Sequence, residues 1–133
     1  MIPKKVFGYD PLVFPLKLWV CFRPDISRIK RMFDVLDEDN YVDYKPITED
    51  DVKPYWGACR LTVRHKASMN TGCLLLFMAM NEFNEGMVVH EVNHAYDEFA
   101  EILKIPINGE TRSYLTQWMT NRVYEAYNKE ERG

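Results

Sequence analysis

The sequence predicts an α+β fold, in which a small mixed or antiparallel sheet with one backing helix is followed by two long C-terminal helices. Three observations predict it: two β-rich apolar segments at 57–65 and 72–80, apolar residues at helical spacing over 26–36, and amphipathic stretches over 84–104 and 110–128. A chain of 133 residues is the size of one domain, so we expect a single domain over residues 1–133.

The first predicted elements are a strand and a helix. The segment 16–22 alternates well enough for a strand, and Pro24 closes it. Asp25 can then cap a helix. Its apolar positions recur at helical spacing and are Ile26, Ile29, Met32, Phe33 and Leu36. A short strand over 41–45 and a turn or capped helical turn over 48–51 follow.

The remaining elements form the larger part of the predicted core. The strand over 57–65 is joined by a polar loop to the strand over 72–80, which is almost continuously apolar, as a strand covered on both faces would be. A helix from about Asn84 to Lys104 must stop before Pro106. After the Asn108-Gly109 turn, a last helix extends to about Asn128.

Composition excludes several classes of partner. The net charge is −3 and the densest basic cluster is only Arg28, Lys30 and Arg31, so we expect no nucleic-acid partner. The longest apolar run, 73–80, is too short to span a bilayer. Three cysteines without framework spacing predict buried free thiols, and no apolar segment follows Lys4-Lys5, so a cytoplasmic location is expected. The oligomeric state stays open.

The motif with the clearest chemistry is His90-Glu91-Val92-Asn93-His94, an HExxH sequence. Histidines four residues apart lie on one face of a helix, so both imidazoles can reach one Zn²⁺ ion. Glu91, about a third of a turn from His90, can act as general base on a metal-bound water. The motif therefore predicts zinc-dependent hydrolysis.

The helical positions around the motif favour a cleft-facing pair of histidines. Val88, Val92, Ala95, Phe99 and Leu103 fall on the side of the helix opposite His90 and His94. This apolar stripe is expected to pack on the sheet and leave both imidazoles facing outward.

A catalytic zinc ion usually has three protein ligands, and three residues are candidates for the third. Glu110, which opens the last helix, is the best placed. Its helix carries a polar stripe opposite an apolar one, made of Leu115, Met119, Val123 and Ala126. Asp97 lies far along a straight helix, though it could orient a ligand imidazole, and His65 is expected at a strand end. If the histidine helix is straight, residues 105–108 must run back toward it.

Other side chains are weaker candidates. The hydroxyls of Tyr114 and Tyr96 could stabilise an oxyanion, with Tyr114 preferred. Cys73 as a metal ligand competes with its being a buried thiol. An oligomerisation surface with exposed Trp118, Tyr124 and Tyr127 is a further alternative.

At these residues the chain resembles the zincin metallopeptidases. Residues 88–95 look like their active-site helix, and a downstream glutamate on the next helix is similar to the gluzincin branch. The resemblance implies a zincin-like fold with His90, His94 and Glu110 as zinc ligands and Glu91 as base. The gap to Glu110 is shorter than in most gluzincins. Glu-x-x-x-Tyr on the last helix also resembles small HExxH proteins encoded by bacteriophages and mobile elements.

We considered one other HExxH family. Gly72-Cys73-Leu74 is superficially similar to the cysteine-ligand motif of peptide deformylases, but its spacing to His90 is much shorter than theirs.

The sequence thus predicts a zinc metallopeptidase acting on a peptide or protein, with an extended segment held at a β-edge as the resemblance implies. The alternative is a non-catalytic metal-binding or interaction protein with the same fold.

Overall fold

The computed structural model describes residues 5–11, 15–37, 39, 43–52 and 57–132. Its elements follow one another along the chain as a strand pair, a helix, four strands, a short 3₁₀ turn and two long helices. They are β1 (Val6–Tyr9), β2 (Lys17–Phe22), α1 (Ile26–Met32), β3 (Phe33–Leu36), β4 (Tyr44–Pro46), β5 (Ala58–His65), β6 (Thr71–Phe77), η1 (Met80–Glu82), α2 (Glu85–Leu103) and α3 (Glu110–Arg132).

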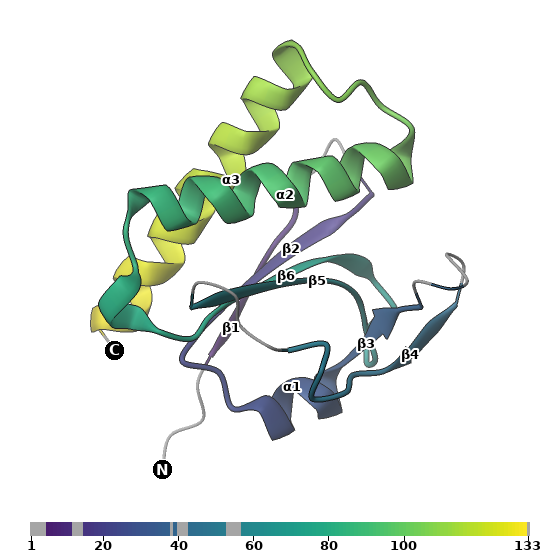
Figure 1. The fold of residues 1–133 in the computed structure, drawn as a ribbon, viewed down its shortest axis with the longest axis vertical. Helices are drawn as coiled ribbons and strands as arrows, with labels where there is room; N and C mark the ends of the chain where they lie inside the picture. Colours follow the sequence, from purple (N-terminus) through teal and green to yellow (C-terminus); the bar gives the residue numbers. More distant parts are fainter. Residues whose placement is uncertain (1–4, 12–14, 38, 40–42, 53–56, 133) are drawn as a thin grey trace.

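The six strands form one mixed sheet in the order β1-β2-β6-β5-β3-β4, with helices on both faces (Figure 1). Only the β2–β6 pair is parallel; the other pairs are antiparallel. The predicted α+β class and the mixed sheet are therefore confirmed. Within the described residues, no helix is long and apolar enough to cross a membrane.

Alternation along the strands divides the core into two clusters. On one face, Leu18, Val20 and Phe22 of β2 pack with the apolar sides of α2 and α3. On the other, Trp19 and Cys21 pack with Ile29 of α1, which is the predicted backing helix. The strand β6 is buried on both faces, as its apolar run predicts.

The helix predicted over 26–36 is wrong in its second half. Asp25 caps α1 as expected, accepting from the Arg28 amide at 3.4 Å, but the helix ends at Met32. Phe33 is extended at φ −132° and ψ 149°, and β3 begins there. The sequence Phe-Asp-Val-Leu fits both the spacing of a helix and the alternation of a strand. Pairing with β5 decides in favour of the strand.

The two long helices carry the predicted functional residues. Asn84 caps α2, and Lys104 ends it in the left-handed conformation at φ 57°. The apolar stripe predicted on α2 is buried, with Leu103 half-buried. The stripe on α3 is completely buried at Leu115, Met119, Val123 and Ala126. The α3 helix extends to Arg132, one turn beyond the predicted end.

The aromatic residues of α3 do not form the exposed surface that was considered. Trp118, Tyr124 and Tyr127 are half-buried against the cluster beneath α2 and α3. Tyr127 stacks on Phe83 with ring centroids 4.8 Å apart. The exposed oligomerisation surface is therefore wrong for these side chains, because intramolecular packing uses them.

Candidate functional site

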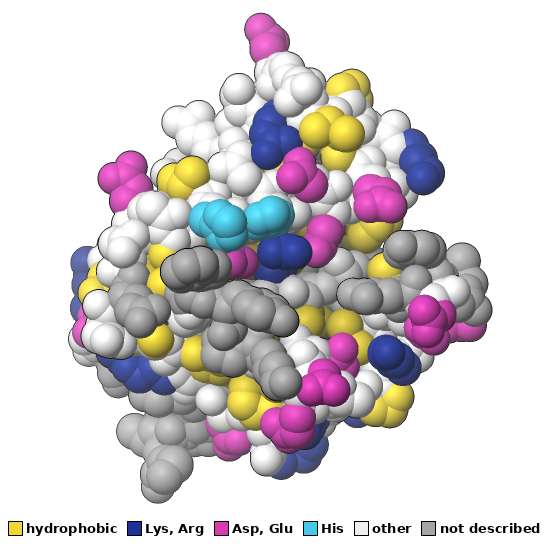
Figure 2. Space-filling view, in the orientation of Figure 1, with side chains coloured by type: hydrophobic (Ala, Val, Ile, Leu, Met, Phe, Trp, Pro, Cys, Tyr) yellow, Lys and Arg dark blue, Asp and Glu magenta, His cyan; other side chains and the backbone are white. Residues whose placement is uncertain are grey.

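The two motif histidines lie side by side on the exposed face of α2. His90 and His94 are both exposed, and their ring centroids are 4.6 Å apart. Figure 2 shows histidine side chains gathered on one face of the molecule, beside basic and acidic side chains. The helix places them there because the stripe on its other side is buried in the core.

The glutamate between the histidines has a different environment. Glu91 is only 6% exposed and is the one charged residue that is buried among the described residues. Its Oε2 lies 3.6 Å from Nη1 of Arg60 and has no hydrogen-bond partner in the described part of the chain. A buried carboxylate oxygen without a donor is unfavourable unless something supplies one, so this atom can accept a proton or a hydrogen bond.

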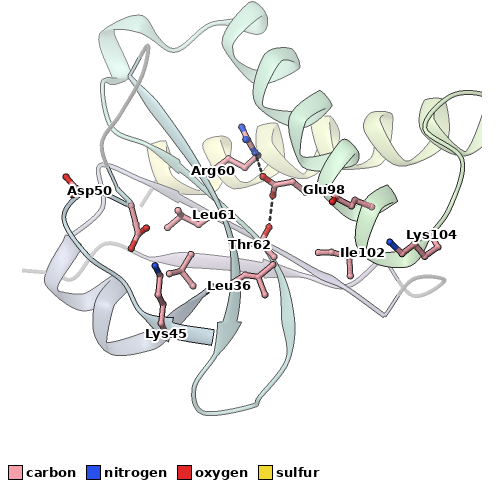
Figure 3. Close-up of a pocket in the computed structure, with 12 residues that line it drawn as sticks. Leu36, Lys45, Asp50, Arg60, Leu61, Thr62, Glu98, Ile102 and Lys104 are labelled. Atoms are coloured by element: carbon pink, nitrogen blue, oxygen red, sulfur yellow. Dashed lines mark hydrogen bonds and ion pairs between the residues drawn. The ribbon is translucent and has the colours of Figure 1, made fainter. Parts of the chain in front are cut away.

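Arg60 links Glu91 to a second acidic side chain of α2. Its Nε donates to Oε1 of Glu98 at 2.7 Å, while the hydroxyl of Thr62 donates to Oε2 of Glu98, also at 2.7 Å (Figure 3). Burial alone would lower the pKa of Arg60, but the hydrogen bond and charge of Glu98 raise it. The guanidinium is therefore a permanent cation beside Glu91.

An open groove begins at this network. It has a volume of about 760 Å³ and its lining includes Arg60, Thr62 and Glu98 but neither histidine. Lys45 and Asp50 lie across it from Ile102 of α2 and from Lys104, which follows that helix (Figure 3). The groove lies where β3 and β5 stop pairing. In the described residues, Val35 and Val63 are the last two residues that pair between these strands.

The candidates for a third metal ligand lie in three different places. Glu110 is exposed in the first turn of α3. Asp97 accepts from Nη1 of Arg112 at 2.7 Å. His65 stacks on Trp19, with Nδ1 2.9 Å from the hydroxyl of Ser68. No cluster of three or more His, Cys, Asp or Glu side chains suited to a metal occurs in the described residues.

His65 is excluded as a third ligand by strand alternation. Odd-numbered residues of β5 pack in the cluster on the α1 side of the sheet, and His65 contacts Trp19 and Phe33 of that cluster. The motif histidines are on α2, which covers the opposite face. The carboxylate of Asp97 pairs with Arg112, and its role as an imidazole acceptor stays a prediction.

The two candidate oxyanion donors differ sharply. Tyr96 is wholly buried and its hydroxyl donates to the carbonyl of Pro106 at 2.6 Å, so the proposed oxyanion role for Tyr96 is wrong. This bond ties the loop after α2 to the core. Tyr114 is 58% exposed on α3, where its hydroxyl remains available to a ligand.

The cysteines are buried free thiols, as predicted. Burial raises the pKa of Cys73 well above its ordinary value, and it raises the pKa of Cys59 to about 11. Metal binding requires thiolate, so a metal-ligand role for Cys73 is disfavoured by its own surroundings.

The two histidines of α2 fit two of the ligand positions of a zinc ion. Imidazole nitrogens are common zinc ligands, and the pair on α2 is exposed and adjacent. The unpartnered oxygen of Glu91 fits a group that receives a proton. The helix α3 is the element that approaches α2 at the histidine turn, through Arg112.

Sequence reasoning missed Arg60, Glu98 and Arg112. A signal for Arg60 was present, since Arg60, Thr62 and Arg64 alternate with apolar residues along β5. Its partner on α2 lies 38 residues away in the chain, and no local pattern identifies it. Comparison of the chain with protein-family models, curated proteins and solved structures finds no match.

Proposed function

We propose that this chain is a zinc-dependent, zincin-type metallopeptidase, gluzincin-like in its ligands, in which His90, His94 and Glu110 bind zinc and Glu91 is the general base. The observation that carries the proposal is the exposed, adjacent histidine pair, with ring centroids 4.6 Å apart, on either side of Glu91 in an HExxH helix. The substrate is a peptide or a segment of a protein.

Bound zinc would supply a Lewis acid that polarises a peptide carbonyl and activates water at neutral pH. Glu91 takes a proton from the attacking water through its unpartnered Oε2 and gives it to the leaving amine as the C–N bond breaks. The exposed hydroxyl of Tyr114 donates to the developing oxyanion.

The groove supports an extended peptide as the substrate class. In the described residues, the part of β5 before Val63 does not pair with β3. Its backbone can therefore form hydrogen bonds with an extended peptide that adds to the sheet as a strand. Arg60 lines the groove and lies 3.6 Å from Glu91, so a peptide in the groove would contact the guanidinium that is next to the general base.

The first test is the zinc content of the purified chain, measured by elemental mass spectrometry. We expect near one zinc ion per chain in the wild type and loss of zinc in His94→Ala. His65→Ala is the matched control, because this histidine lies on the other face of the sheet and its removal should leave zinc bound. Zinc-free wild-type protein, even after zinc is added back, would contradict the proposal.

A second candidate function is non-catalytic metal binding. The contact between Glu91 and Arg60 favours it, because a base engaged by a guanidinium must share its charge. Glu91→Gln separates the two functions when zinc content and cleavage of a fluorogenic peptide library are measured together. A peptidase keeps zinc and loses cleavage in this variant, whereas a binding protein shows no cleavage in either form.

A further inference from the structure

The turn that joins β5 to β6 is closed by the side chain of His65. The imidazole Nδ1 accepts from the backbone N–H of Ser68 at 3.3 Å and lies 2.9 Å from the hydroxyl oxygen of the same residue. That hydroxyl oxygen accepts in turn from the backbone N–H of Asn70 at 3.2 Å. One ring nitrogen therefore connects the last residue of β5 to the residue that precedes β6.

These hydrogen bonds assign the proton of the ring. A nitrogen that accepts from an N–H group has a free lone pair, so Nδ1 of His65 is unprotonated and the neutral ring carries its proton on Nε2. The hydroxyl of Ser68 accepts from Asn70 and keeps its own proton to donate to Nδ1. The closed turn thus requires neutral His65 in one tautomer.

A proton on Nδ1 is incompatible with the contact to the Ser68 backbone. Histidine changes its charge between about pH 8 and pH 5, and both nitrogens of the imidazolium are donors. At low pH the N–H of Ser68 would face a second N–H instead of a lone pair, so this amide must turn away. The hydroxyl can only accept from the ring, in competition with the N–H of Asn70.

Aromatic contacts hold the ring itself in place. The imidazole stacks on Trp19 with ring centroids 5.9 Å apart, and it meets the ring of Phe33 edge-on at 5.3 Å. An indole face attracts a cation at this distance, so protonation does not weaken the stacking. The response to a proton is therefore expected in the turn rather than in the position of the ring.

The surrounding charges give an imidazolium no carboxylate partner. The charged residues of the two strands that contact the ring are Asp34 of β3 and Lys17 of β2. Alternation puts Asp34 on the other face of the sheet, where it pairs with Arg64 and also with Lys66, each at 3.7 Å. Lys17 has its own acidic partner. Among the residues described, none forms an ion pair with His65 that would replace the lost contact.

We propose that His65, Ser68 and Asn70 form a pH-sensitive clasp, which closes the β5–β6 turn when the ring is neutral and opens it when the ring is protonated. Met69 lies between the two turn residues, is 59% exposed and has a left-handed φ of 63°. Surrounding contacts are needed to keep a residue with a Cβ in this conformation, so opening the clasp frees Met69 to leave it. This inference does not rest on the proposed function.

Nuclear magnetic resonance of the full chain, labelled with ¹⁵N and titrated from about pH 8 to pH 5, tests the clasp. At the upper pH we expect the ring nitrogens of His65 to show a proton on Nε2 and none on Nδ1. The backbone amide resonances of Ser68 and Asn70 should then shift with the same midpoint as the ring. The ring protons should keep the shift that stacking on Trp19 causes.

Two variants serve as controls. His65→Asn supplies a side-chain oxygen that accepts a hydrogen bond but does not titrate, so the amides of Ser68 and Asn70 should not shift over this pH range. His90→Ala combined with His94→Ala leaves His65 as the single histidine, since the chain has 3, and the turn should respond as in the wild type. This double variant and the wild type decide the outcome even if His65→Asn does not fold.

Three results would overturn the inference. A proton on Nδ1 at the upper pH is one, because the N–H of Ser68 could then not donate to it. Amides of Ser68 and Asn70 that stay fixed while the ring of His65 titrates are another. The third is a shift of equal size in folded His65→Asn, which would place the titrating group elsewhere. The zinc content of the chain tests the proposed function separately.

Discussion

At the scale of single residues, the charge buried at Glu91 is the feature that most needs an explanation. A buried carboxylate is stable only with a partner, and here the partner is a guanidinium at 3.6 Å that another carboxylate holds in place. Arg60 thus pairs with two acidic side chains of α2 from one position on β5, by a hydrogen bond to Glu98 and by charge alone to Glu91. The arrangement keeps a charged group next to the histidine pair without exposing it.

Removal of Arg60 should therefore destabilise the protein strongly. Arg60→Met leaves Glu91 buried without a cation, and we expect a loss of about 3 kcal/mol in the free energy of unfolding. Adding Glu91→Gln to this variant removes the uncompensated charge and should restore at least about 1 kcal/mol. Urea denaturation of the wild type, Arg60→Met, Glu91→Gln and the double variant measures both changes. Equal stability of Arg60→Met and wild type would show that the pair is not important for folding.

The second residue-scale prediction concerns Tyr96, whose side chain is buried and whose hydroxyl donates to the carbonyl of Pro106 at 2.6 Å. Tyr96→Phe leaves that carbonyl without its donor, so we expect about 1 kcal/mol lower stability. Zinc content and any peptidase activity should be unchanged, because the ring is completely buried and its hydroxyl faces the loop. Lost activity with unchanged zinc content would restore the oxyanion role rejected here.

At the scale of elements, the parallel pair β2–β6 approaches very closely at one glycine. Gly72 lies opposite Lys17 in this register, and a Cβ on Gly72 would be 2.0 Å from the carbonyl oxygen of Lys17. Backbone cannot move as a flexible side chain can. Glycine is therefore required for the two strands to approach.

We expect Gly72→Ala to lower the free energy of unfolding by about 3 kcal/mol or more, or to prevent folding, because the two strands must separate at this point. Gly86→Ala, in the first turn of α2, is the control. There the added Cβ meets only the side-chain oxygen of Asn84 at 3.2 Å, and helix propensity favours alanine. Thermal denaturation compares the two, and similar melting temperatures would contradict the steric argument.

The region around Met32 shows how an element is decided by its neighbours. Phe33 and Leu36 continue the helical spacing of α1, so a helix through 36 was a reasonable prediction. The structure instead pairs Phe33, Asp34 and Val35 with β5. Residues 33–36 fit both helical spacing and strand alternation. Hydrogen bonds to β5, which lies far along the chain, make them a strand.

At the scale of the whole molecule, burial in the core on both faces of the sheet raises the pKa of two thiols, Cys59 and Cys73. Burial raises the pKa of Cys59 to about 11, above its ordinary value of 9.0. Because the pKa of Cys59 is raised in the folded state, the contribution of Cys59 to stability is fully present below about pH 9 and is lost as pH rises toward 11. The loss is about 1.4 kcal/mol per pH unit in that window.

The corresponding measurement is urea unfolding of wild type and Cys59→Ala, under reducing conditions, at several pH values from neutral to about 10.5. Tyrosines and lysines titrate in both proteins, so the difference between the two curves isolates Cys59. We expect the wild type to lose more stability than the variant above about pH 9. Parallel curves would show that Cys59 titrates alike in the folded and unfolded states.

Much of this fold could be predicted because its patterns are local. The cap at Asp25, the buried stripe of α2 and the four buried positions of α3 follow from spacing within one helix. The exposure of His90 and His94 follows in the same way, since an apolar stripe on one side of a helix leaves the other side to solvent. The strand β1 and the order of the strands were not predicted, because pairing involves distant segments.

The sequence by itself determined the α+β class, the helix that carries the HExxH motif and the side on which its histidines lie, because periodicity acts over a few residues. Tertiary structure alone decided what surrounds them. It buried Glu91 next to Arg60 and placed His65 on the opposite face of the sheet. It also directed the hydroxyl of Tyr96 to the carbonyl of Pro106 and joined α3 to α2 through Arg112. These contacts join residues from different elements, so they exist only after the sheet and helices have packed together.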